Sequence, residues 1–131
     1  MPLFRKPKPQ PTISRREALA MVPVRNRQVE ATPQPGGVVL LTYPLAIKPW
    51  FGKLAGKVGM WDDRPLIKKL ELDEMGTFVW ERIDGRNSVK DIARLFTEHY
   101  QVQAREAELS VTAFIKDIGQ RGIIGLKDNE D

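Results

Sequence analysis

The sequence changes its apolar period within residues 66–83, which read Leu66-Ile-Lys-Lys-Leu-Glu-Leu-Asp-Glu-Met-Gly-Thr-Phe-Val-Trp-Glu-Arg-Ile83. Up to residue 72 the side chains alternate between two faces, as they do along a β-strand. One face carries Leu66, Leu70 and Leu72, and the other carries Ile67, Lys69 and Glu71. Lys68 interrupts the apolar face, which indicates that this strand has an exposed edge or end.

Beyond Leu72 the apolar residues recur every three or four positions, and this period predicts helices. Asp73 is a favourable N-cap for the first helix, which Asp84-Gly85 closes. Ser88, with an acidic residue three positions later, opens the second helix. The third is expected from Ala104 to Arg121, before a glycine suited to the C′ position.

Upstream of these elements the sequence predicts a β-hairpin. Residues 28–32 and 38–43 are two extended runs, and Pro33-Gln-Pro-Gly-Gly37 between them is typical of a turn. A capping box, Ser14-Arg-Arg-Glu17, favours one short helix before the hairpin. Residues 123–126 form a last extended piece. We therefore expect an α+β fold with a three-stranded antiparallel sheet followed by a three-helix, winged-helix-like bundle.

The length of 131 residues suits one domain. Residues 1–13 are rich in proline and basic residues, so we expect a disordered arm there and a single domain over residues 14–131. No apolar run is long enough for a signal peptide or a spanning helix. These features predict a cytoplasmic protein.

The residue inventory argues against catalysis. The sequence has no cysteine and one histidine, His99, so thiolate sites and two-histidine metal sites are excluded. His99 lies near the end of a predicted helix, where a structural or exposed role is expected. We therefore predict that the protein is not an enzyme and holds no cofactor or metal.

An inserted segment at residues 46–61 combines aromatic and basic residues. On a helix, its aromatic and basic side chains would form an amphipathic surface suited to a partner or an anionic membrane. The candidate docking residues are Trp50, Phe51, Lys53, Leu54, Lys57 and Trp61. The alternative is an inserted loop whose aromatic residues pack on the domain itself, because Gly52, Gly56 and Gly59 disfavour a helix.

The net charge of +4 is unevenly distributed. Residues 1–61 hold ten Lys and Arg against two Glu, a balance of +8, whereas residues 62–131 hold eleven against fifteen Asp and Glu, a balance of −4. The third predicted helix has no excess of positive charge for phosphates. A winged-helix DNA-binding protein is therefore an alternative that the charges disfavour, and no nucleic-acid partner is expected.

Residues 66–126 resemble the PqqD family, the pyrroloquinoline quinone (PQQ) synthesis protein D and its relatives. The order and spacing of several short motifs carry the resemblance. These motifs are Leu70-Glu-Leu-Asp-Glu-Met-Gly76, Phe78-Val-Trp80, Ile83-Asp-Gly85, Ser88-Val89, Asp91-Ile92-Ala93, Tyr100 and Arg121-Gly-Ile-Ile124. The basic arm and the segment 46–61 are additions to the usual family length.

The resemblance implies a non-catalytic peptide chaperone, a recognition element for ribosomally made modified peptides. Such a domain captures the leader of a precursor peptide by β-strand addition and presents it to a modifying enzyme, commonly a radical S-adenosylmethionine (SAM) enzyme. Carried over to this sequence, the peptide would lie between the strand at 66–72 and the helix at 104–121. The site residues would be Leu66, Ile67, Lys68, Lys69, Leu70, Glu71, Glu108, Thr112, Ile115 and Gly119.

Two alternatives accompany this hypothesis. The first is a structural or membrane-associated adaptor without a peptide substrate, because the segment 46–61 directly precedes the expected peptide-binding strand. The second is dimerisation through the same strand edge. The four residues assigned to the third helix depend on which flank of that helix borders the strand, and the sequence leaves both flanks open.

Overall fold

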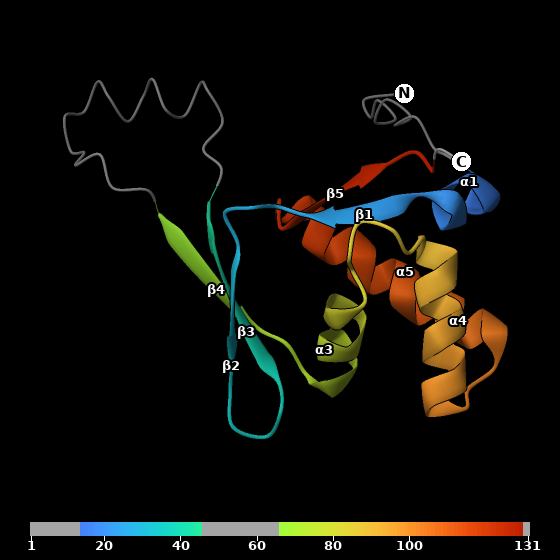
Figure 1. The fold of residues 1–131 in the computed structure, drawn as a ribbon, viewed down its shortest axis with the longest axis horizontal. Coiled ribbons are helices and arrows are strands. Elements are labelled where there is room, and N and C mark those ends of the chain that lie inside the picture. Colours follow the sequence, from blue (N-terminus) through green and yellow to red (C-terminus); the bar gives the residue numbers. More distant parts are fainter. Residues whose placement is uncertain (1–13, 46–65, 130–131) are drawn as a thin grey trace, which may run out of the picture.

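The computed structural model describes residues 14–45 and 66–129. Three helices lie on one side of a three-stranded sheet, and a smaller two-stranded sheet lies above them (Figure 1). The expected arm at residues 1–13 and the segment 46–61 with its docking residues lie outside the described residues. Within the described ranges, no helix is both long and apolar enough to cross a bilayer.

The expected hairpin and third strand form one antiparallel sheet in the order β2-β3-β4. Strand β2 spans Glu30–Pro33, β3 spans Val39–Pro44 and β4 spans Ile67–Glu71. Gly36 and Gly37 have φ angles of 90° and 80° in the turn between β2 and β3. Glycine adopts these angles without the steric cost that a Cβ brings, so the Pro-Gly-Gly sequence determines the turn.

The first two of the three expected helices follow their predicted N-caps, and the third begins after Gln103, whose side chain does not cap it. Helix α3 spans Glu74–Glu81, α4 spans Val89–Tyr100 and α5 spans Ala104–Gln120. The Asp73 carboxylate accepts a hydrogen bond of 2.7 Å from the Gly76 N–H, and Ser88 forms a reciprocal capping box with Asp91. Residue 121 is the C-cap of α5, so the predicted end of this helix is off by one position.

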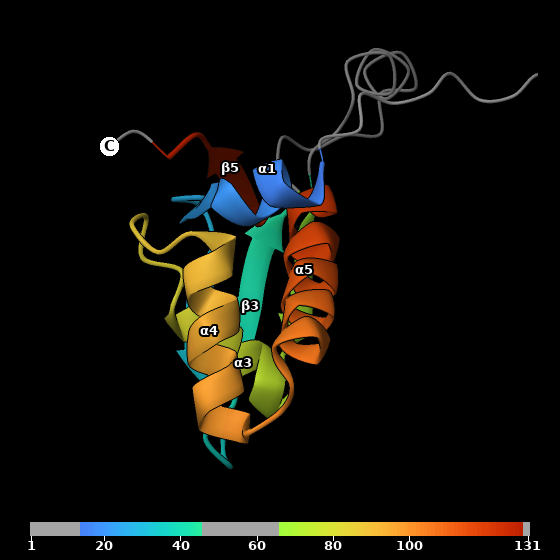
Figure 2. The same ribbon diagram turned by 90° about the vertical axis from the view of Figure 1, so that its right-hand side faces the viewer.

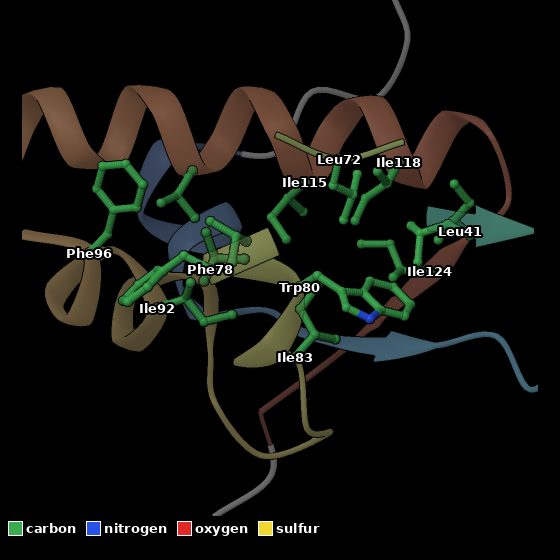
Figure 3. Packing of buried hydrophobic residues seen from close by; sticks show 14 of the residues in the cluster. Leu41, Leu72, Phe78, Trp80, Ile83, Ile92, Phe96, Ile115, Ile118 and Ile124 are labelled. Atoms are coloured by element: carbon green, nitrogen blue, oxygen red, sulfur yellow. The ribbon is translucent and has the colours of Figure 1, made fainter. Parts of the chain in front are cut away.

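The core lies between the inner face of the sheet and the three helices. Figure 2 shows α4 and α5 side by side in front of β3. The sheet contributes buried Leu41 and Tyr43 and, just after β4, buried Leu72. Figure 3 shows Leu72 close to Ile115 and Ile118 of α5. The apolar stripe of α5 therefore packs against the sheet as its period predicted.

The outer end of β4 departs from the expected pattern. Leu66 was assigned to the apolar face, but its side chain is 54% exposed. Leu70 is half-buried and Leu72 is buried, so burial increases along the strand toward α3. The outer end of β4 is therefore less covered than the end that leads into α3.

The sequence predicted only one of the two strands of the smaller sheet. Strand β1 (Val22–Arg25) follows the short helix α1 (Arg15–Ala20) and pairs antiparallel with β5 (Ile124–Lys127). The sequence predicted an extended piece at residues 123–126 but no strand at 22–25. Val22 is buried in this pair, and the Asn26 N–H donates to the carbonyl of Ile123. Residues from both ends of the described chain thus meet above the helices (Figure 1).

Candidate functional site

Strand β4 lies at one edge of the larger sheet. In the part of the chain that the structure describes, β4 pairs with β3 on one side and with no strand on the other. An edge strand exposes backbone groups that can pair with another extended segment. The direction of these groups determines which residues of β4 are available.

The hydrogen bonds to β3 show which backbone groups face outward. The Leu72 N–H donates to Val39 and the Leu45 N–H donates to Leu66, both over 2.8 Å. Antiparallel pairs alternate between bonded and non-bonded positions, so residues 66, 68, 70 and 72 direct their backbone groups at β3. Ile67, Lys69 and Glu71 therefore direct their N–H and C=O groups away from the sheet.

The side chains of β4 alternate in the same period. Lys68 and Leu70 are paired with buried Tyr43 and Leu41, so they belong to the face that carries the helices. Ile67, Lys69 and Glu71 lie on the opposite face and are exposed. The residues with outward backbone groups are thus the same three whose side chains lie on the solvent face.

The other edge of the sheet is less suited to pairing. The Gln34 N–H donates to Val38 over 2.8 Å, so Glu30 and Thr32 face β3 and Ala31 and Pro33 face outward. Proline has no N–H, and edge prolines oppose the addition of a further strand. Residues 66–72 contain no proline, so β4 keeps all three outward donors.

A hollow of about 370 Å³ lies where the end of α5 approaches β4. Its lining includes Tyr43, Lys68, Gly119 and Arg121. The Arg121 guanidinium donates to the Tyr43 hydroxyl and to the Asp117 carboxylate, each over 3.2 Å. These hydrogen bonds, the one to Tyr43 first, raise the pKa of Arg121. Arg121 therefore connects the end of α5 to the sheet.

A second hollow, of about 170 Å³, lies where α3 begins, and α3, α4 and α5 line it. Two residues separate α3 from the end of β4. Met75 and Gly76 of α3 and Ser110 and Phe114 of α5 are among its lining residues. A Cβ on Gly76 would lie 3.1 Å from the Phe114 ring, so this glycine permits a close approach of the two helices. Together with Arg121, these contacts place the flank of α5 that carries Ser110, Phe114 and Arg121 toward the sheet and α3.

The residues that the sequence assigned to α5 are divided among three places. Gly119 shares a hollow with Lys68, and Ile115 is buried in the core. Glu108 and Thr112 line a hollow of about 150 Å³ against α1, where Glu108 pairs with Arg15. The structure therefore does not place Glu108 and Thr112 beside β4, because the opposite flank of α5 carries the contacts to α3 and the sheet.

Two polar side chains outside the edge contact the Phe78 ring. His99 is exposed, and its ring stacks on Phe78 with 4.6 Å between centroids. The Arg82 guanidinium lies 3.6 Å from the centroid of the same Phe78 ring, a cation–π geometry. Among the described residues, no group of three or more histidine or acidic side chains could hold a metal ion.

Comparisons with known proteins support the resemblance seen in the sequence. No curated protein matches the chain. A solved structure with a TM-score of 0.53 and 20% sequence identity covers 79% of this chain and 88% of its own. It is the solution NMR structure of the PqqD truncation of Methylobacterium extorquens PqqCD, described as a functional and stand-alone RiPP recognition element. The model of the family "Coenzyme PQQ synthesis protein D (PqqD)" matches residues 67–124, which run from β4 through the three helices to β5. Residues 67–124 are thus similar to the PqqD family, and the fold of the chain is similar to that of a PqqD structure.

Proposed function

We propose that this protein is a non-catalytic peptide-binding chaperone. It captures the leader of a precursor peptide as an added strand on β4 and presents it to a modifying enzyme of the radical SAM type. The proposed contacts are the backbone of residues 66–71 and the neighbouring flank of α5, with Gly119 at one end. The role of a recognition element belongs to the solved relative and is transferred here as part of the proposal.

The observation that carries the proposal is the outward backbone of Ile67, Lys69 and Glu71 on the edge strand. Each of these residues offers one donor and one acceptor to an extended peptide. A net gain of about 0.5–1.5 kcal/mol per hydrogen bond makes such pairing a substantial source of affinity. The hollow beside Lys68 and the hollow at the start of α3 leave room for side chains of the peptide.

A proline substitution at Lys69 tests strand addition. The Lys69 N–H faces outward, so Lys69→Pro removes a donor of the free edge and keeps the hydrogen bonds to β3. We expect this variant to bind a synthetic leader, taken from a short open reading frame beside the gene, at least about tenfold more weakly. Lys69→Ala keeps the N–H and should weaken binding by less than about fivefold.

Ala31→Pro is the matched control, because Ala31 also faces outward but on the edge formed by β2. It should bind the leader like the wild type. Equal losses for the proline and alanine substitutions at position 69 would contradict strand addition. Amide chemical shifts provide a measurement without variants, because the leader should shift Ile67, Lys69 and Glu71 more than Lys68 and Leu70, which already pair with β3.

A further inference from the structure

The solvent face of β4 carries an ordered set of three side chains. Ile67 is 53% exposed, and Lys69 and Glu71 follow it at alternate positions. The exposed side chains on this face are therefore, in order along the strand, apolar, basic and acidic. The helices lie on the other face of the sheet, so they contribute nothing to this surface (Figure 1).

The neighbouring strand does not balance the two charges. Lys69 is paired across the strands with Thr42, and Glu71 is paired with Leu40. Glu30 lies in the same row as Lys69 but on β2, two strands away, at about 10 Å. The positions directly opposite Lys69 and Glu71 on the open side are therefore the nearest cross-strand positions that an opposite charge could occupy.

We propose that this face selects the peptide by the order of its charges, a proposal that rests on the function proposed above. The added strand carries an acidic residue opposite Lys69, a basic residue opposite Glu71 and an apolar residue opposite Ile67. Cross-strand pairs of opposite charge stabilise a sheet and like charges destabilise it. The ligand is thus a peptide with a basic, an acidic and an apolar residue at alternate positions, and the acidic residue is the middle one of the three.

The orientation of the peptide follows from the same order. In an antiparallel peptide, the residue opposite Glu71 comes first in the sequence, so the order from the N-terminus is basic, acidic, apolar. In a parallel peptide the order is apolar, acidic, basic. In both cases the three residues share one face because side chains alternate along a strand. Residues between them face the helices and leave the charge order unchanged.

The test selects peptides from a synthetic pool with the full-length protein. Each ten-residue peptide has valine or threonine at even positions and Lys, Glu, Ile or Ser at odd positions. The wild type should enrich peptides with Glu between Lys and Ile by about tenfold over those with the two charges exchanged. The double variant Lys69→Glu, Glu71→Lys should reverse this preference, while the single variant Glu30→Lys leaves it unchanged.

Each other outcome overturns a different part of the proposal. Enriched peptides that shift the Ile67, Lys69 and Glu71 amides but show no charge order would overturn the selection and leave strand addition intact. If no enriched peptide loses affinity in Lys69→Pro, strand addition fails, and the charge order fails with it. Dimerisation of the free protein through β4, seen as a doubled mass that Lys69→Pro halves, would also overturn the proposal.

Discussion

Asp84 organises the turn between α3 and α4. Its carboxylate accepts hydrogen bonds from the N–H groups of Asn87 and Arg86, over 2.8 and 2.9 Å. These two bonds, the one from Asn87 first, lower the pKa of Asp84 below its ordinary value. A lowered pKa in the folded state favours folding above the unfolded-state pKa of about 3.9, and this contribution disappears as the pH falls through the folded-state pKa.

The free energy of unfolding should therefore depend on pH through Asp84. Below about pH 4, we expect the wild type to lose more stability than Asp84→Asn, whose amide oxygen can accept the same hydrogen bonds without titrating. Urea denaturation at several pH values from 5 down to 2.5 measures the difference. Parallel stability curves for the two proteins would contradict the role of this carboxylate.

Ser88 stabilises the fold as the N-cap of α4. It is buried, and its hydroxyl accepts a hydrogen bond of 3.0 Å from the Asp91 N–H at the start of α4. Ser88→Ala should lower the free energy of unfolding by about 1 kcal/mol, because the first turn then loses its cap. Ser110→Ala, at an exposed position inside α5, is the matched control and should change stability by less than about 0.5 kcal/mol.

The sequence predicted the helix caps Asp73 and Ser88 because each bonds to a residue only three positions further along the chain. The contact of Arg121 with Tyr43 joins residues 78 positions apart, and no local pattern indicates it. This contact helps to place one flank of α5 toward the sheet. The sequence could therefore predict the strand of the candidate site but could not predict which residues of α5 accompany it.

Helix α5 contributes to the core through one stripe only. Ile118 is fully buried, whereas Leu109 on the opposite side of the same helix is 60% exposed. Ile118→Ala should lower the free energy of unfolding by about 2–4 kcal/mol, since it leaves a cavity, and Leu109→Ala should change it by less than about 0.5 kcal/mol. Urea midpoints at an unchanged slope measure both. Similar losses for the two variants would contradict the observed packing of α5.

The residue pattern along the sequence predicted the strands of the larger sheet better than those of the smaller sheet. Residues 38–43 are mostly β-branched, aromatic or leucine, and Pro-Gly-Gly precedes them, so both the strand and the turn were expected. β1 has only four residues, Val22-Pro-Val-Arg25, and a proline within such a run argues against a strand. It forms because β5 pairs with it from the other end of the described chain, and this pairing has no local signal.

The pairing of β1 with β5 joins distant parts of the whole molecule. Ile123, just before β5, and Ile124, its first residue, are buried, and the chain from Gly119 to Gly122 lines the hollow beside Lys68. The small sheet thus holds the end of α5 in position next to the edge strand. Its loss would affect both the stability of the fold and the candidate site.

Two truncations test this dependence. Ending the chain after Gly122 removes both buried isoleucines and leaves β1 without its partner, and each lost isoleucine costs about 2–4 kcal/mol. Since small domains have only about 5–15 kcal/mol in total, we expect the cooperative thermal transition to disappear. Ending the chain after Lys127 keeps β5 and should leave the melting temperature within about 2 °C of the full chain. A sharp transition in the shorter protein would show that the larger sheet and its helices fold without the pairing of β1 and β5.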